Sequence, residues 1–395
     1  MTDKQVQALL RKAMPELIRI RRYIHQHAEF RHKEFGTAAL VERELGNLGI
    51  EARRIGATGV LGLIRGPRGG RTVGLRGDMD ALELVERTGL PYASTNGYMH
   101  ACGHDGNTTI LLAAARVLAA MRGSLRGTVK LFFQPAEEGG GRGGLMMCEA
   151  GVMERPKVDA VFGIHGFPGY PLGTIAASGG TVQASSDKLV LRVIGRGGHA
   201  AAPNKTVDPI VIAARIIEGL QTIVSREQAP EARAVVTLAC IQAGSPNSQN
   251  IIPDEVLIVG TIRSVTPQQQ EEIFAAVRRI ATHTARSHRG RCVVRIIKGL
   301  PPTVNDHAMA ELVRRVGSRV LGEGMVKDEE LSMGGEDFSF FLHRAPGCYI
   351  RLGLSEKGRD VGSPHSPRYD FNDKAIPLGA RIMAGIAKTF LDENK

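Results

Sequence analysis

The sequence contains no tryptophan, and aromatic residues make up only 5% of its 395 positions. Aromatic rings supply the flat surfaces on which sugars and unpaired nucleobases stack. Their scarcity argues against a carbohydrate-binding or nucleobase-stacking surface. The sequence also lacks any apolar run approaching the 18 or so residues of a membrane-spanning helix. We therefore expect no membrane partner.

Cysteine is scarce as well, with only Cys102, Cys148, Cys240, Cys292 and Cys348. Their number is odd, and residues 1–30 lack the apolar core of a secretory signal because Arg and Lys interrupt the apolar positions. Thiols stay reduced in the cytoplasm. We expect a cytoplasmic protein without disulfides, in which Cys102 has some other role.

Acidic residues are outnumbered: 51 Lys and Arg stand against 40 Asp and Glu, for a net charge of +11. A basic balance is compatible with nucleic acid, an anionic membrane surface or small anionic substrates. The charge is spread along the chain, and the densest basic run is only Arg19-Ile20-Arg21-Arg22. No basic motif is interleaved with aromatic residues, so we do not expect a nucleic-acid partner.

The length and a hydrophobic content of 43% favour a globular protein of two domains. In residues 1–184 and 302–395, helical periodicity over 3–28, 36–48 and 107–121 alternates with strand patterns at 60–64, 72–75 and 128–133. That alternation predicts a catalytic α/β/α domain around a parallel or mixed sheet. Residues 185–301 instead show the order β-α-β-β-α-β, typical of a ferredoxin-like α+β sandwich, and predict an inserted domain.

The sequence Cys102-Gly103-His104-Asp105 stands at the start of a predicted helix. Cys102 and His104 can face one ion if the backbone between them is extended. Thiolate and imidazole suit zinc, cobalt, nickel or iron better than magnesium or calcium. Taken alone, the motif is equally compatible with a buried free cysteine beside a helix-start histidine.

Glu137-Glu138 follows a predicted strand and precedes three glycines. Adjacent side chains on an extended segment point in opposite directions, so one carboxylate can bind a metal while the other acts as a general base. A solvated acidic turn is the alternative. His165 and His365 lie in two further loops and complete a set of donors for two metals.

The order of six motifs resembles the aminoacylase/carboxypeptidase-type di-metal amidohydrolases, and more narrowly the hippurate hydrolase and indole-acetyl-amino-acid hydrolase branch. The resemblance covers nearly the whole chain. The motifs are Arg-Gly-Asp-Met-Asp-Ala-Leu (76–82), Met-His-Ala-Cys-Gly-His-Asp (99–105), Gln-Pro-Ala-Glu-Glu (134–138), Gly-Gly-His-Ala-Ala-Ala-Pro (197–203), Gly-Gly-Glu-Asp-Phe (334–338) and His-Ser-Pro (365–367).

The resemblance implies a role for each matching residue. Two divalent ions, of zinc, manganese, cobalt or nickel, are expected on Cys102, His104, Glu138, His165 and His365. Glu137 matches the general base, and Asp80 matches a carboxylate that orients a ligand. His199 matches a histidine that stabilises the tetrahedral intermediate across a dimer interface, so the inserted domain is expected to be a lid and to form a homodimer. Asn250 and Arg263 fall where the substrate carboxylate is held.

The implied activity is metal-dependent hydrolysis of an N-acyl amino acid to a carboxylic acid and a free amino acid. A dipeptidase or carboxypeptidase is the runner-up, and a non-catalytic binding protein is disfavoured by the retained ligands and base. The sequence departs from the family pattern at positions expected near the cleft, where the departures would alter specificity: Glu83, Asn107, Asn204 and Pro364.

Overall fold

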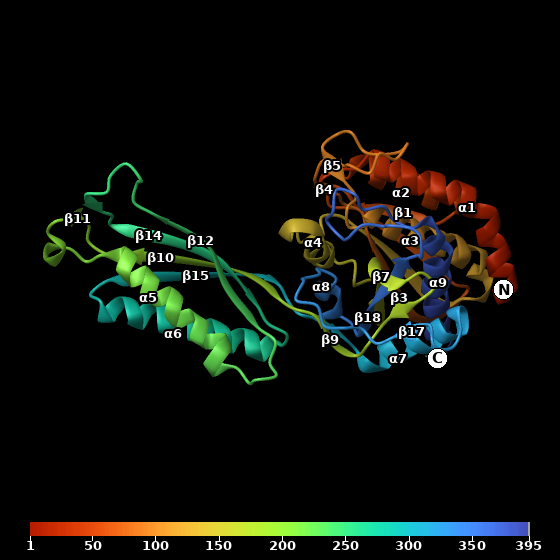
Figure 1. Ribbon diagram of the computed structural model, residues 1–395. Coiled ribbons are helices and arrows are strands. Elements are labelled where there is room, and N and C mark those ends of the chain that lie inside the picture. The colour runs from red at the N-terminus through yellow and green to blue at the C-terminus, as the bar shows by residue number, and fades with distance from the viewer. Residues whose placement is uncertain (394–395) are drawn as a thin grey trace. The chain divides into compact units, whose positions relative to one another are not determined.

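The computed structural model describes residues 1–393 and separates into two units. Unit 1 contains Met1–Val182, Thr303–Glu330 and the chain from Asp337 on, and unit 2 contains Gln183–Pro302 with the short segment Leu331–Glu336. That segment was not expected in the inserted block. It joins unit 2 because the backbone N–H of Ala184 donates to the carbonyl of Ser332 (3.0 Å). Figure 1 labels many of the elements of each unit.

Unit 1 is built on a mixed sheet of eight strands. Its central strands β6, β3, β7 and β18 are mutually parallel, whereas β2 joins β6 and β1 joins β2 in antiparallel fashion. In spatial order the strands are β1 (Glu51–Ile55), β2 (Gly59–Arg65), β6 (Arg126–Gln134), β3 (Arg68–Asp78), β7 (Ala160–Pro171), β18 (Gly347–Ser355), β8 (Ile175–Ala176) and β17 (Val326–Lys327). Since parallel strands end at one edge of a sheet, the loops after β3, β6 and β7 lie together.

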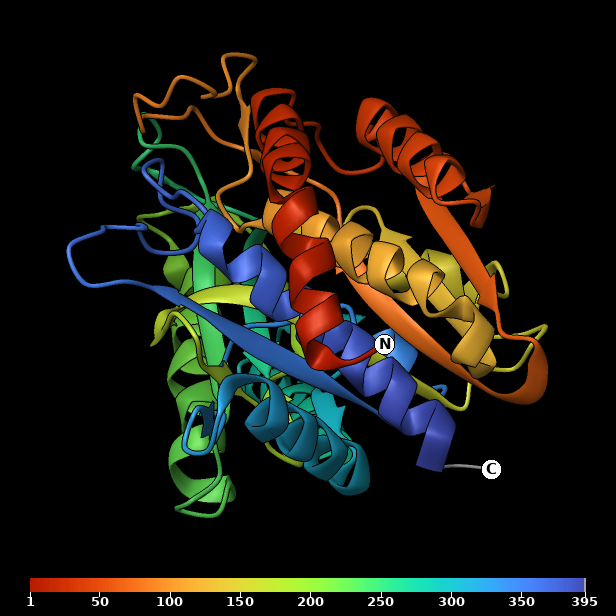
Figure 2. The same ribbon diagram turned by 90° about the vertical axis from the view of Figure 1, so that its right-hand side faces the viewer.

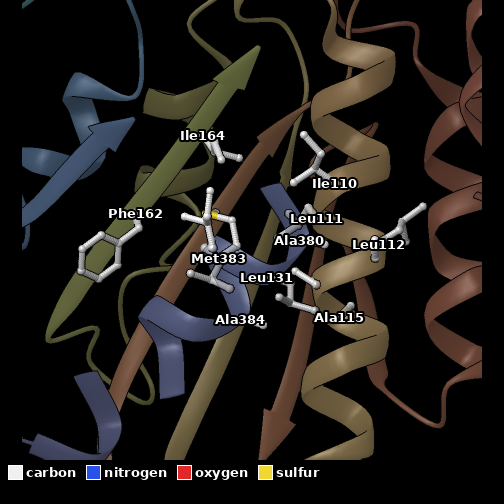
Figure 3. Close-up of a cluster of buried hydrophobic side chains, with 14 of the residues drawn as sticks. Ile110, Leu111, Leu112, Ala115, Leu131, Phe162, Ile164, Ala380, Met383 and Ala384 are labelled. Atoms are coloured by element: carbon white, nitrogen blue, oxygen red, sulfur yellow. The ribbon is translucent and has the colours of Figure 1, made fainter. Parts of the chain in front are cut away.

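Helices pack on the sheet through apolar faces. Three of them, α1 (Asp3–Gln26), α3 (His104–Ala120) and α9 (Ile376–Glu393), lie next to one another in front of the strands in Figure 2. Figure 3 shows Ile110 and Leu111 of α3 meeting Met383 of α9 over strands β6 and β7, and these side chains are fully buried. The other helices of the unit are α2 (Phe35–Asn47), α4 (Gly143–Glu149), α7 (His307–Leu321) and α8 (Ser339–Leu342). Over residues 1–393, no helix combines the length and apolarity needed to cross a membrane.

Short elements complete unit 1. Two-stranded pairs join β4 (Leu82–Glu83) to β5 (Tyr98–Met99) and β9 (Gly180–Gln183) to β16 (Thr303–Asn305). The 3-10 turns of this unit are Arg122–Ser124, Glu138–Gly140 and Asp373–Ala375.

Unit 2 has the predicted β-α-β-β-α-β order. Its antiparallel sheet runs β12 (Val235–Ala243), β14 (Glu255–Arg263), β10 (Ser186–Ile194) and β15 (Arg291–Leu300). Helices α5 (Pro209–Thr222) and α6 (Pro267–Ser287) cover one face and bury a core of its own. This is the ferredoxin-like arrangement. A small pair that the sequence did not predict, β11 (Gly198–His199) with β13 (Ile251–Ile252), projects beyond it, next to the 3-10 turn Pro203–Lys205. A π-helical turn, Ile223–Glu227, continues the far end of α5.

Candidate metal centre and active site

Five predicted ligands of unit 1 converge at the edge where its parallel strands end. Glu138 follows β6, His165 lies on β7, and Cys102 and His104 stand at the start of α3. His365 comes from the loop after β18, in a left-handed conformation (φ 63°). Residues separated by more than 250 positions are thus brought together by the sheet.

The donor atoms form three overlapping groups, and within each group they lie within 4.8 Å of one another. Cys102 belongs to two of these groups. In the first, its Sγ is 3.5 Å from Nε2 of His165. In the second, the other two donors, Nε2 of His365 and Oε1 of Glu138, are 3.2 Å apart. Glu137, the predicted general base, lies in the third. The groups are Cys102, His104, His165; Cys102, Glu138, His365; and His104, Glu137, Glu138.

The chemistry of this cluster fits divalent metal ions. Nε2 of His104 is buried without a hydrogen-bond partner among residues 1–393, and Oε1 of Glu138 is buried with only the His365 imidazole beside it, a costly state that a bound cation relieves. Burial raises the pKa of the Cys102 thiol, and the Glu138 carboxylate raises it further, so a thiolate here requires a cation. The mixture of sulfur, imidazole and carboxylate donors suits zinc-like transition metals.

The charges around the cluster favour a positive charge at His104. Burial alone would lower the pKa of this imidazole, but the Asp78 and Asp80 carboxylates outweigh it and hold that pKa well above its ordinary value. Negative side chains therefore line the place where the metal donors meet.

Asp80 connects His104 to the two glutamates. Its Oδ1 lies 3.2 Å from Nδ1 of His104 and accepts the backbone N–H of Glu137 (3.1 Å), and its Oδ2 accepts that of Glu138 (2.9 Å). Burial tends to raise the pKa of Asp80, but these hydrogen bonds outweigh it and lower that pKa. An anionic Asp80 thus orients the imidazole and the two glutamates at once.

Asn107 lies underneath the site and does not line a cleft. Its side chain is fully buried, Nδ2 donates to Oδ1 of Asp78 (2.8 Å), and Oδ1 accepts the N–H of Gly166 (3.0 Å). Asn107 is thus a buried residue beside the metal donors that ties the end of β3 to β7. The other departures, Glu83, Asn204 and Pro364, are exposed.

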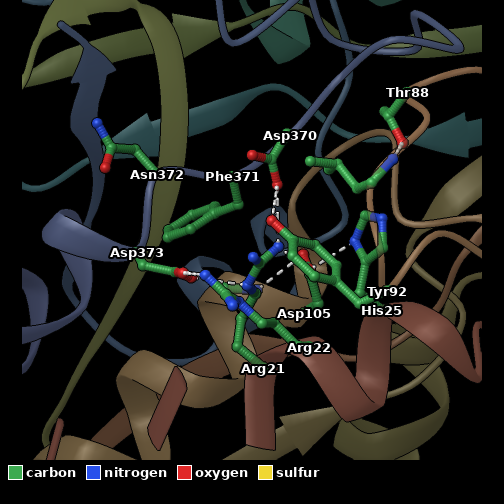
Figure 4. Close-up of polar contacts among 12 residues, drawn as sticks. Arg21, Arg22, His25, Thr88, Tyr92, Asp105, Asp370, Phe371, Asn372 and Asp373 are labelled. Carbon is green, nitrogen blue, oxygen red and sulfur yellow. Dashed lines mark hydrogen bonds and ion pairs between the residues drawn. The ribbon is translucent and has the colours of Figure 1, made fainter. Parts of the chain in front are cut away.

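The N-terminal segment contributes contacts that the sequence did not reveal. Arg21 of α1 is fully buried and pairs with Asp105 (3.2 Å), Asp370 (3.2 Å) and Asp373 (2.8 Å), as Figure 4 shows. His25 of the same helix lies between Asp105 and Glu86. A helix pattern alone assigns a charged residue such as Arg21 to the solvent face, so no sequence signal marked it.

The predicted substrate residues belong to unit 2, and they occupy two separate places in it. His199 is exposed on β11, and the neighbouring Ala200 N–H donates to the carbonyl of Asn250 (2.9 Å), so His199 and Asn250 lie close together. Arg263 is the last residue of β14, whereas β13 lies just before the first residue of that strand, at its opposite end. At about 3.4 Å per residue, the length of β14 corresponds to about 27 Å.

Known proteins resemble the chain over nearly its full length. A family model described as peptidase family M20/M25/M40 matches residues 74–389. The IAA-amino acid hydrolase ILR1-like 4 of Arabidopsis thaliana is 39% identical over 387 residues, covering 96% of this chain and 86% of the relative. N-acetyl-L-cysteine deacetylase of Bacillus subtilis is 36% identical over 382 residues, covering 96% and 89%. A crystal structure of the Bacillus subtilis YXEP protein, described as a dinuclear metal binding peptidase from the M20 family, superposes with a TM-score of 0.85 at 31% identity, covering 97% and 99%.

Proposed function

The chain belongs to the peptidase family M20/M25/M40, and we propose that this metal-dependent amidohydrolase cleaves N-acyl amino acids to a carboxylic acid and a free amino acid. The observation that carries the proposal is the cluster of Cys102, His104, Glu138, His165 and His365 beside Glu137. Two of the similar proteins are named for the hydrolysis of amino-acid conjugates, an N-acetyl amino acid among them.

In this proposal the five clustered side chains hold two divalent ions of zinc, manganese, cobalt or nickel. When bound, such ions polarise a carbonyl and make water acidic enough to attack it near neutral pH. Glu137 takes a proton from the attacking water as the new C–O bond forms, and gives that proton to the amide nitrogen as the C–N bond breaks. Asp80 keeps His104 and the Glu137 backbone in place throughout.

Residues of unit 2 complete the proposed site. His199 donates a hydrogen bond to the developing oxyanion, and Asn250 and Arg263, supplied by different copies of the chain, bind the substrate carboxylate. We also propose a homodimer formed through unit 2. Ile210 and Val211 of α5 are 45% and 51% exposed, and β12 is an edge strand with Ile241 53% exposed. Apolar side chains and unpaired strand edges are surfaces that a two-fold partner can cover.

All five cysteines are free thiols, which supports a working place in a reducing compartment such as the cytoplasm. Small anionic substrates are also a better explanation of the net charge of +11 than nucleic acid is, because the basic residues are spread along the chain.

The test is hydrolysis of a panel of N-acetyl, N-benzoyl and long-chain N-acyl amino acids by the enzyme loaded with cobalt, manganese or zinc. Dipeptides are assayed in parallel, because one similar structure is described as a peptidase. We expect turnover of an N-acyl amino acid that Glu137→Gln abolishes. Faster cleavage of dipeptides would establish the runner-up, and no turnover of either class with metal bound would refute hydrolysis.

A further inference from the structure

Three consecutive backbone N–H groups at the active site are each held by a buried carboxylate. Asp80 accepts those of Glu137 and Glu138, as described above. The N–H of Ala136 donates to Oε1 of Glu34 (2.9 Å). Glu34 comes from the loop between α1 and α2, more than 100 positions earlier in the chain, and it is fully buried.

Ala136 is the point at which the chain turns into the catalytic segment. Its φ of 51° is in the left-handed region, which residues with a Cβ rarely adopt. Such a conformation persists only when surrounding contacts hold it. Two contacts do so: Glu34 binds the Ala136 N–H, and the Ala136 carbonyl accepts the N–H of Gly143 (2.9 Å). The direction in which Glu137 leaves the strand therefore depends on Glu34.

The same loop also holds the far side of the catalytic segment. Nη1 of Arg31 donates to the carbonyls of Glu138 (3.1 Å) and Gly139 (2.6 Å), and the His32 imidazole lies 2.9 Å from the carbonyl of Gly141. A Cβ on Gly139 would come within 2.0 Å of Arg31 Nη1. Side chains of the loop between α1 and α2 thus pack directly against the backbone of residues 138–141.

We propose that Glu34 is a positioning residue for the general base: by binding the Ala136 N–H it fixes the backbone turn that aims Glu137 at the substrate. Glu34 itself does not touch the substrate. The inference rests on the proposed function insofar as it takes Glu137 as the base. The full length of the side chain is required, because Oε1 also accepts the N–H of His32 (2.9 Å) while Oε2 accepts the hydroxyl of Thr58 (2.6 Å).

Three substitutions separate the effect of the length of the Glu34 side chain from the effect of its charge. Glu34→Gln keeps an oxygen for the two N–H groups and places an amide against the Thr58 hydroxyl. Glu34→Asp keeps the charge but is one methylene too short to span the contacts. Glu34→Ala removes both. Thr58→Val is the matched control, because it removes the contact to Oε2 and leaves the Ala136 contact intact.

The experiment measures hydrogen exchange of the backbone amides of 136–141, metal affinity, and kcat at saturating metal for each variant. We expect Glu34→Gln and Thr58→Val to keep wild-type protection and kcat. Glu34→Asp and Glu34→Ala should lose protection, and kcat should fall about 100-fold, the cost of a misplacement of about 1 Å. KM should change far less than kcat, because the substrate contacts are untouched.

Two results would overturn the proposal. If Glu34→Asp behaves like the wild type while Glu34→Gln loses protection and kcat, the charge of Glu34 matters and its reach does not. If amide protection and kcat fall in proportion to thermal stability, and do so in Thr58→Val as well as in the Glu34 variants, the contact between Glu34 and Ala136 is only structural. Hydrogen exchange is independent of the substrate, so a failure of the wild type to hydrolyse any N-acyl amino acid would refute the proposed function and leave the exchange result to decide on Glu34.

Discussion

Replacing His25 with Gln should destabilise the protein at neutral pH. It should also make the stability of the protein depend less on pH between pH 6.5 and 9. The ring is fully buried, with Nδ1 2.8 Å from Asp105 and Nε2 3.2 Å from Glu86. Figure 4 shows it pointing from α1 toward Asp105. Burial alone lowers the pKa of His25, but the two carboxylates outweigh it and raise that pKa to about 9.

The magnitude follows from linkage. A histidine in the unfolded chain titrates near 6.5, and at 1.36 kcal/mol per pH unit the difference from about 9 corresponds to about 3 kcal/mol. Because the folded pKa is the higher one, this stabilisation is complete below pH 6.5 and is lost as the pH rises through 9. The same contact helps hold the pKa of Asp105 below its ordinary value against the effect of burial, so the two contributions are not added.

The assay compares thermal unfolding of the wild type, His25→Gln and a control, His283→Gln, between pH 6.5 and 9. His283 is exposed on α6. At about 2–4 °C per kcal/mol for a domain of this order, the His25 variant should melt about 6–12 °C below the wild type at pH 6.5, and the gap should narrow toward pH 9. Parallel curves for the His25 variant and the wild type across this range would refute an ionised, buried His25.

Three further predictions concern the active site. Glu137→Gln should lower kcat by about 10²–10⁴-fold without loss of metal by elemental analysis; loss of metal would show that the roles of Glu137 and Glu138 are exchanged. The Cys102 thiol should react with a labelling reagent only after chelation, whereas in Cys102→Ser metal affinity should fall; equal labelling with and without metal would exclude Cys102 as a ligand. Mixing Glu137→Gln with His199→Ala should restore up to about a quarter of wild-type activity if His199 serves the partner's site in a two-fold dimer, and no recovery despite proven subunit exchange would exclude a shared site.

Most elements of the fold could be predicted from the sequence because their apolar periodicity is local. The helix predicted over 36–48 is Phe35–Asn47, and the strand predicted over 60–64 is Gly59–Arg65. The helix predicted over 107–121 begins three residues earlier, at His104. Its first turn is polar and buried under the metal centre, so the apolar pattern on which the prediction depended starts too late. The cluster of Cys102, His104, Glu138 and the two histidines could be predicted because metal donors are a small set of residue types at strand ends.

The supporting contacts could not be predicted because they join polar residues far apart in the chain. Arg21 and Asp373 are separated by 352 positions, and Glu34 and Ala136 by 102. A buried arginine or glutamate is stable only once its partners surround it, and neither residue type signals burial by itself. Asn107 is a further example: the sequence marks it as a departure beside a motif, but does not reveal that its buried amide joins two strands.

The internal geometry of unit 2 limits how its residues can share one substrate. His199 and Asn250 lie at the β11 and β13 end, and Arg263 lies at the other end of β14, about 27 Å away by the rise of an extended strand. An N-acyl amino acid is far shorter than that. One copy of unit 2 therefore cannot bring both ends to the same substrate, whatever its orientation. If both ends take part in catalysis, the second must come from another copy of the chain. If His199, Asn250 and Arg263 have the proposed roles, the length of β14 therefore requires a shared dimeric site, an argument separate from the exposed apolar side chains of α5 and β12.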